Sequence, residues 1–206
     1  MTTKLKFIFL LVFLLLTLPA YNYLHAENML VDGNIFYTIP DAGGSDKFHT
    51  GKVATVNFNY YYRPWLALSA GIFISEEIFD NSRTDIVGTY QASAETQGIT
   101  IGLRPEYQFS KRNGIYARTG FLFYNTKISV SEFFEPGLPS GTVSDNTDGN
   151  GYYLAAGWKH AFTNTVSFQL ELAVQKQLDL FKGKADPDSV FDLSYPGFSL
   201  GLGYAF

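Results

Sequence analysis

The chain ends in the segment 195–206, YPGFSLGLGYAF. From Phe198 onward every second residue is large and apolar, and the residues between them are Ser199, Gly201, Gly203 and Ala205. Successive side chains of a β-strand point to opposite faces, so this period of two predicts a strand with one oily face and one face of small residues. The oily face consists of Phe198, Leu200, Leu202, Tyr204 and Phe206.

The same period of two extends through the chain before this segment. In 98–109, the odd positions include Ile99, Ile101 and Leu103, and the even positions are Gly98, Thr100, Gly102, Arg104, Glu106 and Gln108. In 166–177, apolar residues alternate with Ser, Gln and Glu in the same way. No stretch after Glu27 shows a helical period, and none is apolar over the roughly 20 residues that a membrane helix needs.

The breaks between the periodic segments alternate in length. The predicted strands are 29–38, 52–62, 65–79, 94–109, 115–130, 151–162, 166–178 and 195–206. Short connections at 63–64, 110–114 and 163–165 alternate with long polar ones at 39–51, 80–93, 131–150 and 179–194. This spacing predicts an all-β fold, an eight-stranded antiparallel up-and-down transmembrane β-barrel with short periplasmic turns and long extracellular loops. In a barrel of eight strands the side chains just fill the interior.

Composition agrees with this fold class and excludes several functions. Charged residues make up only 17% of the chain and aromatic residues also 17%, whereas soluble domains carry about 25% charged residues. The net charge of -4 offers no basic surface for a nucleic acid. The absence of Cys excludes disulfides, thiolate metal sites and a Cys nucleophile.

These patterns resemble the OmpA-like family of small eight-stranded outer-membrane barrels, which includes OmpX and Ail and is similar to accessory colonisation factors. The resemblance implies a location in the outer membrane of a Gram-negative cell. It also implies that the oily C-terminal face, Phe198, Leu200, Leu202, Tyr204 and Phe206, is the signal that the outer-membrane assembly machinery reads. The chain ends at the barrel, so we expect no peptidoglycan-binding domain.

The first residues are expected to be a cleaved signal peptide. Lys4 and Lys6 precede the apolar run 7–18, and Ala26 before Glu27 offers a cleavage point. This arrangement is typical of secretory signals. The expected division is a signal peptide at 1–26 and a single barrel domain at 27–206; the alternative for the first segment is an uncleaved anchor.

Charged residues on the inward face form the first candidate site. They are expected at a similar depth above the short turns and consist of Arg104, Glu106, Arg118, Lys159 and Glu171, with Asp32 as an extension. Buried charges must be paired, so we expect ion pairs between Glu106 and Arg118 and between Lys159 and Glu171. The resemblance implies a similar salt-bridged plug. Such a layer is either a static polar core or a gate for ions or small solutes.

The long connections form the second candidate site. They are rich in Asp and Glu, which argues against binding of heparin-like polyanions and suggests that contact with lipopolysaccharide is bridged by divalent cations. Exposed apolar residues in 131–150 are a candidate partner-contact loop, because such residues cost solubility unless they are covered: Phe133, Phe134, Pro136 and Leu138. Ordinary solvation of exposed loops is the alternative for the charged residues.

Three functions remain open. The first is envelope integrity or surface interaction, such as adhesion or host contact, through the extracellular loops. The second is a narrow channel resembling OmpW. The third is a lipid A-modifying enzyme of the PagP or PagL type, for which His49 and His160 would be the residues to consider. We expect no enzyme, no cofactor and no metal; the expected partners are outer-membrane lipid, lipopolysaccharide, the assembly machinery and a host surface ligand.

Overall fold

The computed structural model describes residues 28–42, 49–79, 83–84, 88–134, 141–183 and 190–206. Eight long strands dominate it: β1 Met29–Thr38, β2 Gly51–Arg63, β3 Leu66–Ser75, β6 Gly88–Gln108, β7 Asn113–Phe134, β8 Gly141–Ala161, β9 Val166–Leu180 and β10 Phe191–Ala205. Two short strands, β4 Ile78–Phe79 and β5 Arg83–Thr84, pair with β6. No helix among these residues is long and apolar enough to cross a membrane.

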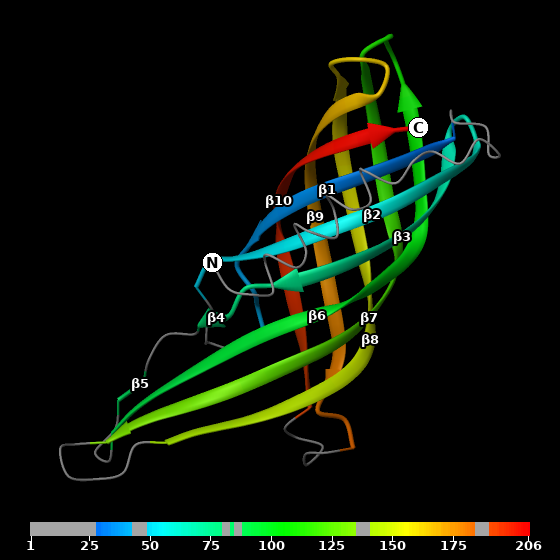
Figure 1. Ribbon diagram of the computed structural model, residues 1–206. Coiled ribbons are helices and arrows are strands. Elements are labelled where there is room, and N and C mark those ends of the chain that lie inside the picture. Colours follow the sequence, from blue (N-terminus) through cyan, green and yellow to red (C-terminus); the bar gives the residue numbers. More distant parts are fainter. Residues whose placement is uncertain (1–27, 43–48, 80–82, 85–87, 135–140, 184–189) are drawn as a thin grey trace.

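The long strands form a closed antiparallel ring (Figure 1). Each strand pairs with its neighbours in the sequence, and the ring closes where β1 pairs with β10, from Leu30 opposite Ala205 to Thr38 opposite Gly197. Because the ring is closed, neither of these two strands is left with an open sheet edge. The predicted eight-stranded up-and-down barrel is confirmed.

Several strands run further than the sequence indicated. The predicted strand 65–79 is divided into β3 and β4, and β6 begins at Gly88 rather than at residue 94. Most of the expected loop 131–150 is also strand, because β7 continues to Phe134 and β8 starts at Gly141. Polar residues of this segment, which are common in loops, lie here in a regular antiparallel ladder. In this ladder Val130 pairs with Val143 and Ser131 pairs with Thr142.

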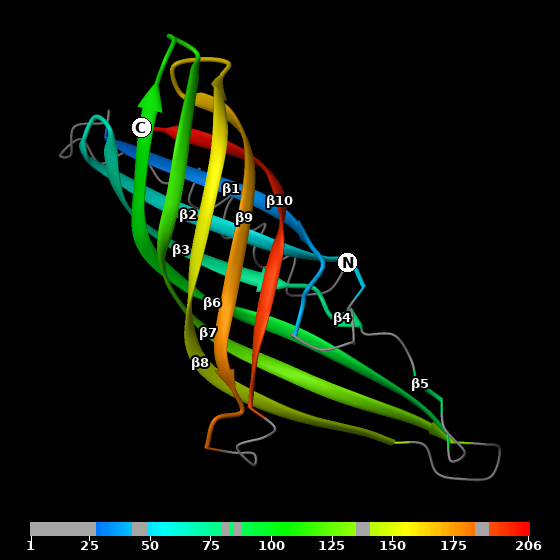
Figure 2. The same cartoon turned by 180° about the vertical axis from the view of Figure 1, so that it is seen from behind.

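β6, β7 and β8 therefore project beyond the rest of the barrel. β8 pairs with β7 from Gly141 to His160 but with β9 only from Gly151 to Ala161. Figures 1 and 2 show the three strands bending and continuing past the ends of their neighbours at the end opposite the short turns. We use the name β6–β8 extension for the parts of these strands furthest from the short turns, which are residues 88–93 of β6, 129–134 of β7 and 141–146 of β8.

Side chains alternate between the two faces of the wall. The outer face carries exposed apolar residues over most of its height, including Leu68, Ile101, Phe121, Leu154, Leu172 and Leu202. The inner face is buried, and it divides into two layers. Charged and amide side chains fill the half near the short turns, and an apolar cluster fills the half near the long connections: Phe36, Val53, Phe73, Ile78, Leu122, Tyr124, Tyr153, Leu180, Leu193 and Tyr195.

Candidate functional site

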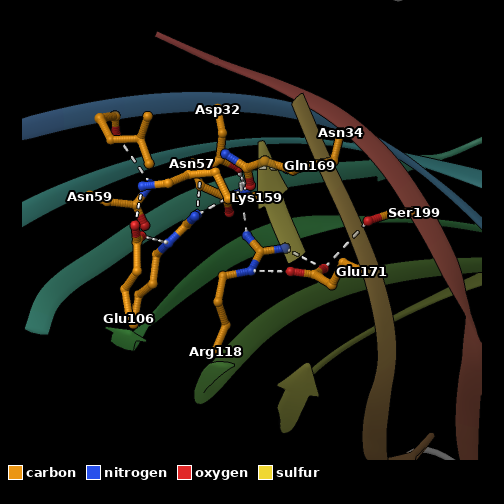
Figure 3. A network of polar contacts seen from close by, with 12 residues as sticks. Asp32, Asn34, Asn57, Asn59, Glu106, Arg118, Lys159, Gln169, Glu171 and Ser199 are labelled. Carbon is orange, nitrogen blue, oxygen red and sulfur yellow. Dashed lines mark hydrogen bonds and ion pairs between the residues drawn. The ribbon is translucent and has the colours of Figure 1, made fainter. Parts of the chain in front are cut away.

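Six charged side chains meet inside the barrel and form one chain of alternating sign (Figure 3). In order across the lumen they are Lys159, Glu106, Arg104, Asp32, Arg118 and Glu171. They come from β8, β6, β1, β7 and β9. Three positive and three negative charges leave this lumen ion chain neutral, which reduces the cost of burying it.

Each arginine donates close hydrogen bonds to a carboxylate partner. Arg118 binds Glu171 through two parallel hydrogen bonds, from Nε to Oε2 at 2.7 Å and from Nη2 to Oε1 at 2.6 Å. Arg104 donates from Nη1 to Asp32 Oδ2 at 2.9 Å. Lys159 binds Glu106. The longer contacts, Arg104 Nε to Glu106 Oε2 at 3.6 Å and Arg118 Nη1 to Asp32 Oδ1 at 3.8 Å, connect these pairs.

Asp32 is the centre of the chain and is fully buried. Three asparagine amides donate to its carboxylate, from Asn34 at 2.5 Å, Asn57 at 2.7 Å and Asn59 at 2.7 Å. Together with Arg104, these donors replace the water that an ionised carboxylate would otherwise bind. The carboxyl group of Asp32 therefore lies between two guanidinium groups.

The predicted ion pairs, Glu106 with Arg118 and Lys159 with Glu171, are wrong, although all five residues lie in one network. The β6–β7 register, with Leu103 opposite Thr119 and Glu106 opposite Tyr116, places Arg104 opposite Arg118. Like charges directly opposite repel each other. Arg104 therefore points to Asp32 on β1, and Arg118 points across the lumen to Glu171 on β9.

Uncharged neighbours hold the lumen ion chain in place, and the sequence analysis did not identify them. Tyr61 donates its hydroxyl to Glu106 Oε2 at 2.6 Å, and the Arg104 guanidinium lies 3.9 Å from the centre of the Tyr116 ring. Gly157 makes room for this ring, because a Cβ at that position would lie 2.4 Å from Tyr116 Cζ. The alternation of inward and outward side chains along the strands would have indicated that Tyr61 and Tyr116 face the lumen. It would not have indicated which charged residue each of them contacts.

In the part of the chain that the structure describes, the lumen ion chain borders a small cavity. This cavity beside Arg118 measures only ≈ 20 Å³ and is lined by residues that include Thr55, Asn57, Thr100 and Tyr153. Such a volume holds about one water molecule. The apolar cluster lies above it, and there Tyr124 donates its hydroxyl to the Leu178 carbonyl at 2.6 Å.

Comparison with known proteins identifies the class of this barrel. Residues 8–206 match the family model described as the outer membrane protein β-barrel domain. The chain belongs to this outer membrane β-barrel family. The predicted recognition and the location in the outer membrane of a Gram-negative cell follow from that membership. No curated protein matches the chain at the level of sequence.

Two solved structures illustrate the shared fold. Ail, the attachment invasion locus protein of Yersinia pestis, has a TM-score of 0.52 at 10% identity, with 88% of this chain and 100% of Ail covered. Neisserial surface protein A has a TM-score of 0.59 at 10% identity, with 86% of this chain and 97% of that protein covered. At this identity the likeness shows the fold alone.

The outer face of β10 carries the residues predicted as an assembly signal. Phe198, Leu200, Leu202 and Tyr204 are exposed there, where an outer membrane barrel faces lipid. Phe206 follows the end of the strand, and its ring packs edge-on against Tyr204 at 4.9 Å. The structure describes where these side chains lie, and their reading by the assembly machinery stays a prediction.

Two of the four candidate partner-contact residues, Phe133 and Phe134, lie in a strand and not in the predicted loop. Phe133 and Phe134 belong to β7 within the β6–β8 extension, whereas Pro136 and Leu138 lie outside the described residues. Phe133 is 55% exposed. Cross-strand pairing up to Phe134, opposite Gly88, explains why polar residues of this segment are strand rather than loop.

His160, which an enzymatic function would require, packs between aromatic rings. Trp158 and Phe162 lie 5.7 Å and 5.4 Å from its ring centre, and its Nδ1 lies 2.9 Å from Asn113 Oδ1. The two rings and Asn113 account for an interfacial position near the short turns, where aromatic residues of membrane barrels gather. This environment gives no support to a catalytic assignment for His160.

Proposed function

We propose that this outer membrane barrel acts in surface interaction, and that the β6–β8 extension is its contact surface. The observation that carries the proposal is the exposure of apolar side chains on a sheet that projects beyond the barrel. Val143 is 73% exposed and Val130 36%, and Phe133, which is 55% exposed, lies on the opposite face of β7. Val130 and Val143 are cross-strand neighbours on one face. Exposed apolar residues gathered on such a projection mark interaction sites.

The form of the extension supports this role. A three-stranded ladder holds the contact residues in fixed positions, so binding would cost less conformational entropy than binding by a mobile loop. The barrel below provides a closed and internally paired base. The extension would therefore present a preorganised surface above the membrane.

The charge of this end of the barrel limits the chemistry of the partner. Ail has been solved in complex with the heparin analogue sucrose octasulfate. In this chain the described residues near the long connections are more often acidic than basic. The acidic ones are Asp41, Glu76, Glu77, Glu95, Glu132, Asp145, Asp148, Asp179 and Asp192, and the basic ones are Lys52, Arg83, Lys127, Lys176 and Lys182. A sulfated polyanion would be repelled. We therefore propose a host protein surface with an apolar patch and no excess of negative charge.

Adhesion of cells that display the protein tests this proposal. The double variant Val130→Ser with Val143→Ser should lower adhesion by about 30-fold, because two removed apolar contacts of about 1 kcal/mol each add up to about 2 kcal/mol. The matched control is Ser131→Ala with Thr142→Ala, the next pair of cross-strand neighbours, which lies on the opposite face. Heat-modifiable gel migration would verify that both variants are folded. Equal adhesion of both variants and the wild type would contradict the proposal.

The second candidate function is a narrow channel. The lumen ion chain could act as its gate if Arg118 exchanged Glu171 for Asp32, whose Oδ1 already lies 3.8 Å from Arg118 Nη1. The two filled layers of the interior favour a static plug instead. Conductance of the purified protein in planar bilayers, compared with Arg118→Ala, separates these alternatives, since a gated channel would conduct more after the substitution.

The proposed mature protein is a single non-enzymatic domain, 27–206, released from a signal peptide at 1–26. Residues 1–27 lie outside the described residues. N-terminal sequencing of the protein from outer membranes should start at Glu27. A start at Met1 would instead indicate an uncleaved anchor.

A further inference from the structure

A groove crosses the outer wall of the barrel, on the side of the membrane that carries the long connections. It measures ≈ 740 Å³ and extends from β2 across β3, β6 and β7 to β8. Its floor follows two adjacent rows of directly paired residues. The row nearer the short turns contains Val56, Ile72, Ile99 and Phe123, and the next row contains Ala54, Ile74, Gln97, Asn125 and Asp148.

The groove is apolar at one end and polar at the other. The first row is entirely apolar, whereas the second row changes from Ala54 and Ile74 on β2 and β3 to Gln97, Asn125 and Asp148 on β6, β7 and β8. Barrel strands are tilted, so a row perpendicular to them changes height in the membrane as it crosses the wall. Polar side chains are unfavourable against lipid acyl chains. The polar end of the row is therefore the end that lies where the outer face leaves the hydrocarbon core.

Residues below and above the groove mark the same boundary. On β6 and β7 the large exposed residues nearer the short turns are apolar and include Ile101, Leu103 and Phe121. On the other side of the groove, Lys127 follows on the same face of β7, opposite Glu95 and Asn146. Asn125 donates from Nδ2 to Asp148 Oδ1 at 2.7 Å, which orients both polar side chains at the groove's end.

We infer that this groove binds lipid A, the lipid portion of lipopolysaccharide in the outer leaflet. Its acyl chains lie on the row of Val56, Ile72, Ile99 and Phe123, which continues the lipid-facing surface. The hydroxyl and amide groups of its glucosamine units form hydrogen bonds with Gln97, Asn125 and Asp148. This site extends beyond the proposed surface interaction and does not depend on it.

The chemistry of the polar end distinguishes lipid A from phospholipid. Asp148 accepts hydrogen bonds, and Gln97 and Asn125 both donate and accept them. Lipid A offers amide N–H and hydroxyl donors close to its acyl chains. The glycerol esters of phosphatidylethanolamine offer acceptors only, and its donor, the ammonium group, lies beyond the phosphate and away from the acyl chains. A phosphate directly beside Asp148 would be repelled, so the neutral groups of the sugar make this contact, and the lipid A phosphates lie nearer to Lys127.

Titration of the purified full-length barrel in nonionic detergent, followed by native mass spectrometry, tests this inference. Lipid A and phosphatidylethanolamine are the two probes. The wild type should retain one lipid A at concentrations at which phosphatidylethanolamine does not remain bound. Gln97→Ala combined with Asn125→Ala should weaken lipid A binding by about 10-fold, because two hydrogen bonds of about 0.5–1 kcal/mol each are lost.

Two further variants examine the apolar end of the groove. Ile99→Trp should fill part of it and weaken lipid A binding, whereas Leu172→Trp, on the outer wall of β9 and 69% exposed, should leave binding unchanged. Asn164→Ala in the short turn between β8 and β9 is the control for the polar substitutions. Heat-modifiable migration shows that each variant is folded.

The inference is overturned if phosphatidylethanolamine binds as tightly as lipid A, or if Leu172→Trp reduces binding as much as Ile99→Trp. The first result would mean that the groove takes up lipid without selecting it, and the second would mean that lipid A does not bind in the groove. Loss of cell adhesion in the Val130 and Val143 variant with unchanged lipid A binding would leave this site intact.

Discussion

The two halves of the barrel interior are filled in opposite ways. Near the short turns the contacts are ion pairs and amide hydrogen bonds around Asp32, and near the long connections they are apolar contacts around Leu122 and Tyr195. Ion pairs require each partner to be present, because a single charge left in the interior is costly. Apolar packing is lost in smaller steps. The comparison indicates that the half near the short turns, called the lower half below, fixes the arrangement of the strands. The half near the long connections, called the upper half, mainly adds stability.

The largest effect is expected from Asp32→Asn. This substitution removes the carboxylate that Arg104 and Arg118 share. Removal of one member of a buried ion pair typically costs about 3–5 kcal/mol. Chemical unfolding of the barrel in lipid vesicles would measure this cost. A loss no larger than that of Asp192→Asn, an exposed aspartate on β10, would show that the lower half does not depend on its central carboxylate.

A smaller loss is expected from Leu122→Ala in the upper half. Leu122 is 0% exposed, and a buried Leu→Ala change costs about 2–4 kcal/mol through lost contacts and the cavity that remains. The same unfolding measurement applies. Leu172→Ala on the lipid-facing wall is the matched control, since lipid can fill the space there. Equal losses at the two positions would argue against tight packing in the upper half.

Gly157→Ala should cost still less, about 1–3 kcal/mol, because the added methyl group overpacks the lower half. Its Cβ would lie 2.4 Å from Tyr116 Cζ and force the ring away from Arg104. Gly141→Ala in the same strand is the control, since a Cβ there meets no atom within 4 Å. Unfolding midpoints that are equal for both variants would show that the ring moves without cost.

The smallest effect concerns an ion pair outside the lumen. Lys176 donates a hydrogen bond to Asp192 that lowers the pKa of Asp192, and the same bond raises the pKa of Lys176. Stability from the lowered Asp192 pKa is therefore present above the ordinary Asp pKa of about 3.9 and is lost as pH falls through the lowered value. Stability from Lys176 is present below about 10.4 and is lost as pH rises further.

Asp192→Asn should accordingly lower the unfolding midpoint slightly at neutral pH. The difference from the wild type should shrink as pH falls, and it should disappear at a pH below the lowered pKa of Asp192, where the carboxyl is protonated in both states. A difference that persists at this pH would assign the effect to packing rather than to charge.

Alternation along the strands was sufficient to predict the fold and the inward position of the charged residues. It predicted that Arg104, Glu106, Arg118, Lys159 and Glu171 share one face and one depth. It could not predict their partners, since these depend on the register across the ring, which places Arg104 opposite Arg118. Spacing within single strands contains no information on contacts between β1 and β6 or between β7 and β9.

The ends of the strands were harder to predict than their faces. Segment 141–150 is rich in Gly, Asn, Asp, Ser and Thr, which are residues typical of turns, yet it continues β8. Its strand conformation depends on pairing with β7, as between Thr126 and Thr147. The β6–β8 extension is thus a product of neighbouring strands, and no local propensity indicates it.

The pairing of β1 with β10 has a consequence for the order of events in folding. Leu30 lies opposite Ala205, so the ring cannot be completed before the residues from 30 to 205 have been synthesised and exported. Contacts between such distant residues form late, because the entropy of the long intervening segment opposes them. Until then the first strand retains an unsatisfied backbone edge, and the cell must keep this edge from pairing with the wrong strand.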